Sequence, residues 1–272
     1  MDAKISVTTC CNAKCKTCPV WGIPGDTMSL ENFAFIWKKL VAAPQITKVM
    51  LNNTGDLYSL SDHRAYFELI HRDNRVWLAM TTNAIALDTI PDVDEVVISF
   101  NGGTRETYED TVGASFDSVR ANIRAQYDAL RKIKEVRLDC LMYEGNQGTE
   151  TDLLREWHDF PGGIRVSYKY DNQGKQDKTL RLFRRVARIP CDYLDKICIL
   201  PSGKVVSCAH DFHAVTDFGN ILTDSIEQLI ENPARLEKKR EHAAGKWIGL
   251  CERCNYNTST EGKFFNVKSR TA

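Results

Sequence analysis

The sequence has no excess of either charge and no long apolar run. Its 36 basic and 36 acidic residues cancel, so the charge balance gives no support for nucleic-acid binding, which usually shows as a basic excess. No apolar stretch approaches the roughly 18 residues of a membrane span, and no apolar signal core precedes the first motif. With only 16 glycines and 8 prolines in 272 residues, a collagen-like or linker-dominated chain is also excluded. We therefore expect a cytoplasmic protein of about two domains that makes no membrane contact.

Cysteine, in contrast, is abundant, with ten copies in the chain. Because cytosolic thiols stay reduced, this number indicates metal ligation or catalysis rather than disulfides. Four of the cysteines lie near the N-terminus and five in the last third, with only Cys140 between the two groups. Two separate metal centres would explain this division.

The N-terminal group contains a loop of three closely spaced cysteines. It reads Cys11-Asn-Ala-Lys-Cys15-Lys-Thr-Cys18, with steps that let one loop place three thiolates around one centre. Three cysteines leave one iron of a [4Fe–4S] cluster open to a non-protein ligand, whereas closed structural sites take four ligands. A zinc knuckle is the alternative for this loop. We expect the adjacent Cys10 to pack at the end of the preceding strand.

Short apolar strands alternate with helices from residue 4 to about residue 170. We expect strands at 4–8, 48–51, 76–80, 95–100, 136–142 and 164–170, and helices at 29–41, 61–71, 116–134 and 149–159. This alternation is typical of βαβ units and a parallel sheet. Six units are too few for a closed eight-strand barrel, so the predicted fold class is α/β, a partial (β/α)6 TIM-like barrel.

The polar segment at 171–179 predicts a domain boundary. It would separate a barrel domain at 1–175 from a small C-terminal domain at 176–272. In barrels of this kind the chemistry lies at the carboxyl ends of the strands. The cysteine loop follows the first strand directly, so it should lie at that active face.

Taken in order along the chain, these motifs resemble those of the radical S-adenosylmethionine superfamily. The sequence Asn-Asn-Thr-Gly-Asp-Leu at 52–57 follows the second strand and is similar to the family's Gly-Gly-Glu-Pro motif. Thr-Thr-Asn at 81–83 follows the third strand and is similar to its Thr-Asn-Gly motif. The segment 99–113 resembles one that is common in members with an extra C-terminal cluster domain.

The resemblance implies a [4Fe–4S] cluster on the three loop cysteines, with S-adenosylmethionine chelating the open iron. The reduced cluster would cleave the cofactor to a 5′-deoxyadenosyl radical, which abstracts a substrate hydrogen. An external donor such as flavodoxin or ferredoxin would supply the electron. By match to the family's motifs, the cofactor-binding residues would be Thr17, Thr54, Gly55, Asp56, Asn83 and Ser99. The Asp56 carboxylate would accept a hydrogen bond from the bound amino group, and Gly55 would let the backbone come close.

The C-terminal cysteines resemble a second module of the same superfamily. Strands at 197–200 and 204–207 around Pro-Ser-Gly predict a hairpin, and a helix is expected at 225–242. This order is similar to the twitch form of the SPASM domain, whose auxiliary [4Fe–4S] cluster would be held by Cys191, Cys208, Cys251 and Cys254. A zinc site with four cysteines is the alternative.

Four other side chains near these motifs are expected to have no ligand role. Cys140 and Cys198 fall inside predicted strands, so we expect both to be buried thiols. His210 and His213 lie close to Cys208 in the sequence and could be ligands. Surface or substrate-pocket positions are the interpretation that we prefer for both histidines.

The same resemblance suggests an oxidoreductase or isomerase. Four protein ligands would close the auxiliary cluster, so that it relays electrons, as in radical dehydrogenases that oxidise a secondary alcohol. The leading hypothesis is therefore the oxidation or rearrangement of a polar small molecule. One alternative is the crosslinking or epimerisation of a ribosomal peptide, and another is a non-catalytic iron–sulfur or zinc module. A catalytic base must reach the substrate, and the candidates at the end of the sixth strand are Arg165, Tyr168, Lys169 and Tyr170.

Overall fold

Six parallel strands form the centre of a single curved sheet. The computed structural model describes residues 1–18, 20, 23–70, 73–143, 145–168, 190–252, 254 and 263–265. The six strands are β1 (Asp2–Ile5), β2 (Lys48–Leu51), β3 (Trp77–Thr82), β4 (Glu95–Ser99), β5 (Glu135–Met142) and β6 (Gly163–Tyr168). Each strand pairs in parallel with the next along the chain. The predicted α/β partial barrel is therefore confirmed.

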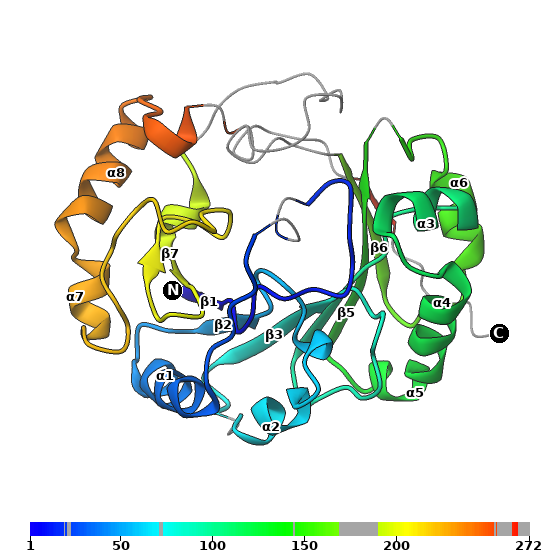
Figure 1. The fold of residues 1–272 in the computed structure, drawn as a ribbon, viewed down its shortest axis with the longest axis horizontal. Coiled ribbons are helices and arrows are strands. Elements are labelled where there is room, and N and C mark those ends of the chain that lie inside the picture. The colour runs from blue at the N-terminus through cyan, green and yellow to red at the C-terminus, as the bar shows by residue number, and fades with distance from the viewer. Residues whose placement is uncertain are drawn as a thin grey trace.

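Helices connect these strands and lie on the outer side of the sheet (Figure 1). They are α1 (Leu30–Ala42), α2 (His63–Glu68), α3 (Arg105–Val112), α4 (Phe116–Ala125), α5 (Tyr127–Leu130) and α6 (Glu150–Glu156). The hydroxyl of Ser29 caps α1 by accepting a hydrogen bond from the N–H of Asn32, which satisfies one of the free donors at a helix start. None of the helices in the described ranges is long and apolar enough to cross a membrane.

The structure corrects the helices expected after the fourth strand. The helix predicted at 116–134 is divided into α4 and α5, because Gln126 leaves helical geometry with φ −98° and ψ 5°. Helix α3 was not predicted, although its start carries a capping box made by Thr104 and Thr107. This additional helix turns out to support the cysteine loop.

The helix predicted at 225–242 is also two helices, α7 (Ile226–Ile230) and α8 (Pro233–Ala243). Proline has no N–H to donate inside a helix, but it is well suited to the first helical turn. Pro233 therefore begins α8, and the side chain of Asn232 caps it. The prediction of one continuous helix was wrong for this reason.

The C-terminal third adds strands to both edges of the sheet. The predicted hairpin is confirmed as β7 (Lys196–Ile199) and β8 (Val205–Val206), which pair antiparallel. Strand β7 also pairs in parallel with β1, and β9 (Lys263–Phe265) pairs antiparallel with β6. The hairpin is thus continuous with the barrel sheet. The predicted domain boundary after residue 175 lies in 169–189, outside the described residues.

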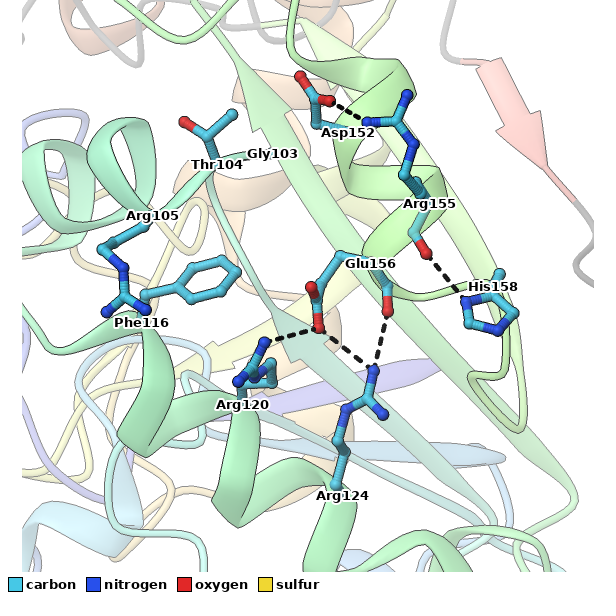
Figure 2. A pocket seen from close by; sticks show the side chains of 10 residues that line it. All are labelled: Gly103, Thr104, Arg105, Phe116, Arg120, Arg124, Asp152, Arg155, Glu156 and His158. Carbon is cyan, nitrogen blue, oxygen red and sulfur yellow. Dashed lines mark hydrogen bonds and ion pairs between the residues drawn. The ribbon is translucent and has the colours of Figure 1, made fainter.

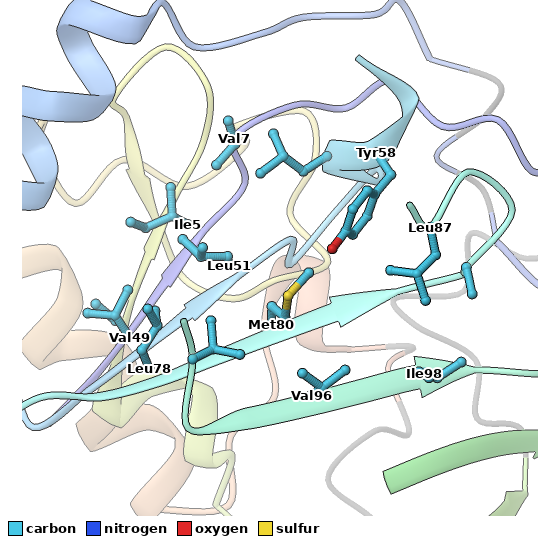
Figure 3. Close-up of a cluster of buried hydrophobic side chains, with 14 of the residues drawn as sticks. Ile5, Val7, Val49, Leu51, Tyr58, Leu78, Met80, Leu87, Val96 and Ile98 are labelled. Atoms are coloured by element: carbon cyan, nitrogen blue, oxygen red, sulfur yellow. The ribbon is translucent and has the colours of Figure 1, made fainter. Parts of the chain in front are cut away.

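The two faces of the sheet differ in character, because successive side chains in a strand point to opposite faces. Outward-facing residues pack beneath the helices in a buried apolar core (Figure 3). They include Ile5, Val49, Leu51, Leu78, Met80, Val96 and Ile98. The inner face of the same strands carries charged side chains instead. Since the interior of a TIM barrel is ordinarily filled by branched apolar residues, this polar inner face indicates a different use.

Candidate active site

A cavity of about 270 Å³ opens where strands β1 to β5 end. The loop after β1 lines it with Cys11, Ala13, Cys15, Thr17 and Cys18, and further lining comes from the segments that follow the other strands. All six residues predicted to bind the cofactor also line this cavity: Thr17, Thr54, Gly55, Asp56, Asn83 and Ser99. Motifs that lie far apart in the sequence are thus brought to one place. Their individual roles stay predictions.

The cysteine loop is held against the end of helix α3. The backbone N–H of Lys14 donates to the carbonyl of Val112 at 3.0 Å, and the N–H of Lys16 donates to the carbonyl of Thr111 at 2.9 Å. These are carbonyls at the carboxyl end of a helix, which have no partner inside the helix. The loop therefore completes α3, and α3 in turn fixes the loop between the first and second cysteines.

Burial, more than mutual repulsion, keeps the thiols of Cys11 and Cys15 protonated in the absence of a bound group. Burial raises the pKa of Cys11 to about 11 and that of Cys15 to about 12, and the nearby Cys18 thiolate raises both further. The side-chain amide of Asn83 donates to the sulfur of Cys11 at 3.4 Å. Thiolates are the form that binds iron, so loading of a cationic iron centre would release protons here. Three close thiols that resist ionisation by themselves fit a cluster that bears positive charge on its irons.

Asp56 is an internal anchor of the cavity wall. Its carboxylate is only 2% exposed. It accepts hydrogen bonds from the N–H of Tyr58 at 3.1 Å, the hydroxyl of Thr82 at 3.0 Å and the N–H of Asn83 at 2.6 Å. Burial raises its pKa to about 6, while the two N–H donors and Thr82 oppose that rise. A carboxylate has about four acceptor positions, so Asp56 can still accept one bond from a ligand.

Two buried polar atoms of the same wall have no protein partner among the described residues. They are the side-chain carbonyl oxygen of Asn52 and the hydroxyl of Thr54, and both residues line the cavity. Buried polar groups in folded proteins are almost always hydrogen-bonded. These two atoms therefore fit a polar cofactor in the cavity, and S-adenosylmethionine offers amino, carboxylate and ribose groups to meet them.

The C-terminal cysteines lie close enough to influence one another. Burial raises the pKa of Cys191 to about 12, with further contributions from the thiolates of Cys254 and Cys251. Burial also raises the pKa of Cys208, and Cys198 and Cys191 add to this. Within the described ranges, no three His, Cys, Asp or Glu side chains are grouped tightly enough to hold a single metal ion.

The other cysteines and the histidines lie where the sequence placed them. Cys140 and Cys198 are buried in β5 and β7, as predicted. His210 lines the same cavity as the cysteine loop, and burial lowers its pKa to about 3, so its ring is neutral. His213 is exposed.

A chain of ion pairs crosses the inner face of the barrel, and the sequence analysis missed it. Lys48 contacts Glu95 at 2.5 Å, and Glu95 contacts Arg137 at 3.6 Å. The guanidinium of Arg137 donates to Asp139 at 2.7 Å, and Asp139 also binds Arg165. The signal was present as charged residues at alternate positions of β4 to β6. It could not be interpreted without the register that brings these positions together.

Of the four candidates for a catalytic base, only Arg165 can be placed. It lies on the inner face of β6 with a side chain that is 44% exposed, and its guanidinium donates to Asp139. Tyr168 ends β6, but its side chain is outside the described part of the structure. Lys169 and Tyr170 lie wholly outside the described residues.

A second cavity, of about 580 Å³, lies on the outside of the barrel between α4 and α6 (Figure 2). Arg120 and Arg124 both bind the carboxylate of Glu156, at 3.4 and 3.2 Å, and Arg155 binds Asp152 at 2.8 Å. None of the predicted site residues lines this cavity. Its arginines are engaged in ion pairs on the helix surface.

Comparisons with known proteins agree with this geometry. Residues 191–255 match the SPASM family, an iron–sulfur cluster-binding domain. The structure is similar to that of BtrN in complex with AdoMet and 2-DOIA, with 15% identity, a TM-score of 0.59, and coverage of 93% of this chain and 92% of BtrN. The chain therefore shares the fold of BtrN, and its C-terminal part matches the SPASM family model.

Two further solved structures share the radical S-adenosylmethionine fold. One is anSMEcpe with bound AdoMet and Cp18Cys peptide, with 15% identity, a TM-score of 0.66, and coverage of 94% of this chain and 89% of that one. The other is SuiB of Streptococcus suis bound to the precursor peptide SuiA, with 12% identity and a TM-score of 0.66. The match covers 88% of this chain and 66% of SuiB. No curated protein matches the sequence significantly. The SPASM match includes all four C-terminal cysteines that were predicted as ligands.

Proposed function

We propose that the chain is a radical S-adenosylmethionine enzyme that oxidises or rearranges a polar small molecule. Cys11, Cys15 and Cys18 would hold the catalytic [4Fe–4S] cluster, and the SPASM cysteines would hold an auxiliary [4Fe–4S] cluster that relays electrons. When bound, the first cluster and S-adenosylmethionine together supply a 5′-deoxyadenosyl radical that removes a hydrogen atom from the substrate. A small reductant such as flavodoxin or ferredoxin would deliver the electron.

The observation that carries this proposal is the charged inner face next to the cavity. In the β4–β5 ladder Asp139 is paired with Ser99, which lines the cavity. Leu141, two residues further along β5 on the same face, lines it as well. The Asp139–Arg165 pair therefore lies on the same face of the sheet as Leu141, next to the residues that line the cavity. A substrate rich in hydroxyl, amino or acidic groups would find both donors and acceptors there, whereas an apolar one would leave them unpaired.

A solved structure with a similar fold supports a small-molecule substrate as well. BtrN, which matches 93% of this chain, was solved in complex with AdoMet and 2-DOIA. In this chain the corresponding region for binding a substrate is the polar interior of the barrel.

Peptide modification is the second candidate function. It is supported by the TM-scores of 0.66 to SuiB and anSMEcpe, both solved with peptides and both more similar in fold than BtrN at 0.59. The two candidates share the cluster chemistry and differ in what occupies the barrel interior.

The test is a hydrogen-transfer assay with labelled substrates under anaerobic conditions. The reconstituted chain is given S-adenosylmethionine, a reductant, and either carbon-deuterated polyols and aminocyclitols or carbon-deuterated peptides. Deuterium in 5′-deoxyadenosine from a polyol or aminocyclitol is the expected result. Deuterium from peptides alone would overturn the small-molecule proposal, and a complete lack of cofactor cleavage would overturn the radical mechanism.

A further inference from the structure

Arg235 is a buried cation that forms no ion pair with a carboxylate of the described residues, although Asp195 lies near enough to oppose the lowering of its pKa by burial. It belongs to α8, its side chain lies in the interior, and the residue is 1% exposed. One guanidinium nitrogen donates to the carbonyl of Leu194 at 3.0 Å and approaches the sulfur of Met1 at 3.9 Å, while the other terminal nitrogen has no partner among the described residues. Burying a charge in this way is costly unless an opposite charge lies close by.

Lys4 is a second cation in the same region and is half-buried. It lies on the inner face of β1, where its ammonium group approaches the sulfur of Met50 at 3.6 Å and lies 4.9 Å from the ring centre of Tyr193. Burial lowers the pKa of Lys4, although Cys198 opposes this effect. No carboxylate of the described residues comes within ion-pair distance of either Lys4 or Arg235.

The two cations contact residues that lie two and three positions after a predicted cluster ligand. Cys191 precedes the short helix η3 (Asp192–Asp195). Lys4 covers the ring of Tyr193, and Arg235 holds the carbonyl of Leu194. The two positive charges are thus anchored within three residues of Cys191.

The buried thiol of Cys198 connects the cations with a second ligand. Cys198 is the register partner of Lys4 in the β1–β7 ladder. Cys198 is also the register partner of Val206 in the β7–β8 hairpin, two residues before Cys208. Cys191 and Cys208 both pack against the small apolar cluster that contains Tyr193 and Cys198.

We propose that Lys4 and Arg235 are the counter-charges of the auxiliary cluster and raise its reduction potential. This inference rests on the proposed function, since it requires an iron–sulfur cluster on the SPASM cysteines. A [4Fe–4S] cluster on four thiolates is an anion, and its reduction adds one more negative charge. Buried positive charge stabilises the reduced form more than the oxidised form, because Coulomb interactions grow with charge and are weakly screened in the interior. An auxiliary cluster that must accept an electron from a substrate radical benefits from this shift.

The test is a redox titration of the reconstituted full-length chain, followed by electron paramagnetic resonance. The auxiliary signal is assigned by comparison with the chain in which Cys11, Cys15 and Cys18 are all alanine. In Arg235→Gln and in Lys4→Met we expect the equilibrium constant for reducing this cluster to fall at least about tenfold, a shift of about 59 mV to more negative potential. Arg235→Lys keeps the charge and should restore most of the potential.

The matched control is Arg240→Gln, on the same helix but exposed and paired with Glu237. It should leave the potential unchanged. If Arg235 and Lys4 were needed for packing alone, their variants would lower the unfolding midpoint and leave the potential of the loaded cluster at the wild-type value. That result would overturn this inference and leave the proposed function standing. Zinc in the SPASM site would overturn the electron relay and this inference together.

Discussion

The backbone N–H of Asn83 donates a hydrogen bond of 2.6 Å to the buried carboxylate of Asp56. This bond ties the end of β3 to the loop that follows β2. The side-chain amide of the same Asn83 reaches the sulfur of Cys11 at 3.4 Å. Three motifs that follow three different strands are therefore joined by one short series of contacts, with Asp56 at its buried end.

Replacement of Asp56 by asparagine should destabilise the apoprotein. The carboxylate accepts hydrogen bonds from three donors. In asparagine an NH2 group replaces one of the two oxygens, and because this group is itself a donor, it cannot accept those bonds. We expect a loss of about 1–3 kcal/mol in the free energy of unfolding, the usual range for an unsatisfied buried group. Urea unfolding of the metal-free chain measures it. Asp62→Asn is the control, because Asp62 is exposed and its side chain makes no capping bond, and an equal loss there would contradict this account.

The stability that Asp56 contributes should fall as the pH rises. Burial raises its pKa from 3.8 to about 6 in the folded chain, so between these values the folded state holds a proton that the unfolded state has lost. Stability from this group is complete below the unfolded pKa and is lost as the pH rises through the folded pKa. The advantage of the wild type over Asp56→Asn should shrink by roughly 2 kcal/mol between pH 4 and pH 7. Urea unfolding of both chains across this range tests the sign, and a growing advantage would refute it.

Replacement of Gly55 by alanine should disrupt the cavity wall. Gly55 has a φ of +65°, and an added methyl group would meet the carbonyl oxygens of Thr8 at 2.3 Å and Cys10 at 2.6 Å. Both carbonyls are backbone atoms at the start of the cysteine loop and cannot move aside easily. We expect Gly55→Ala to lower both the unfolding midpoint and the iron content. Gly148→Ala is the control that has backbone strain without a steric clash, since Gly148 has a φ of +85° with open space around it. We expect it to lower the free energy of unfolding by only about 1 kcal/mol.

Much of the cavity could be predicted because its residues follow strands in a parallel sheet. The cysteine loop and the residues from Thr54 to Asp56 each come directly after an apolar strand. The carboxyl ends of parallel strands meet at one edge of the sheet. Chain order alone therefore places these segments together. The break before α8 could also have been read, because an asparagine followed by a proline is a strong signal for a new helix start.

Contacts that depend on register or on distant pairing were not accessible from the sequence. The pair between Asp139 and Arg165 exists because these residues are register partners in β5 and β6, and a slip by one residue would turn one side chain to the outer face. The pairing of β7 with β1 joins segments separated by most of the chain. The burial of Arg235, which forms no ion pair with the described residues, appears only when α8 is packed in place.

Replacement of Cys11, Cys15 and Cys18 by alanine should remove one cluster and leave the other. We expect about eight irons and eight sulfides in the wild type after reconstitution, and about four of each in the variant, with no cleavage of S-adenosylmethionine. Cys10→Ala is the matched control, since the adjacent thiol is not needed as a ligand, and it should retain the full iron content. Cofactor cleavage by the triple variant would show that the cluster assignment is wrong. About four irons and one zinc in the wild type would identify the SPASM site as a zinc site.

Arg165 should act on the substrate and not on cofactor cleavage. Its guanidinium is held by Asp139 on the inner face below the cavity, and 44% of the side chain is exposed. Arg165→Gln removes the charge, while Asp139 keeps its bond of 2.7 Å from Arg137, so the fold should be retained. Loss of one charged hydrogen bond to the substrate is worth about 2 kcal/mol, which is roughly a thirtyfold fall in kcat/KM.

The measurement compares two rates in the same anaerobic reaction. One is the transfer of deuterium from the polyol or aminocyclitol that the screen identifies, and the other is 5′-deoxyadenosine formed without substrate. In Arg165→Gln the first rate should fall and the second should stay, because the cysteines and the cavity wall are untouched. Arg155→Gln, which removes an exposed arginine of α6 that is paired with Asp152, should change neither rate. A parallel loss of both rates in Arg165→Gln would mean that the inner-face ion pairs support the cluster region and do not contact the substrate.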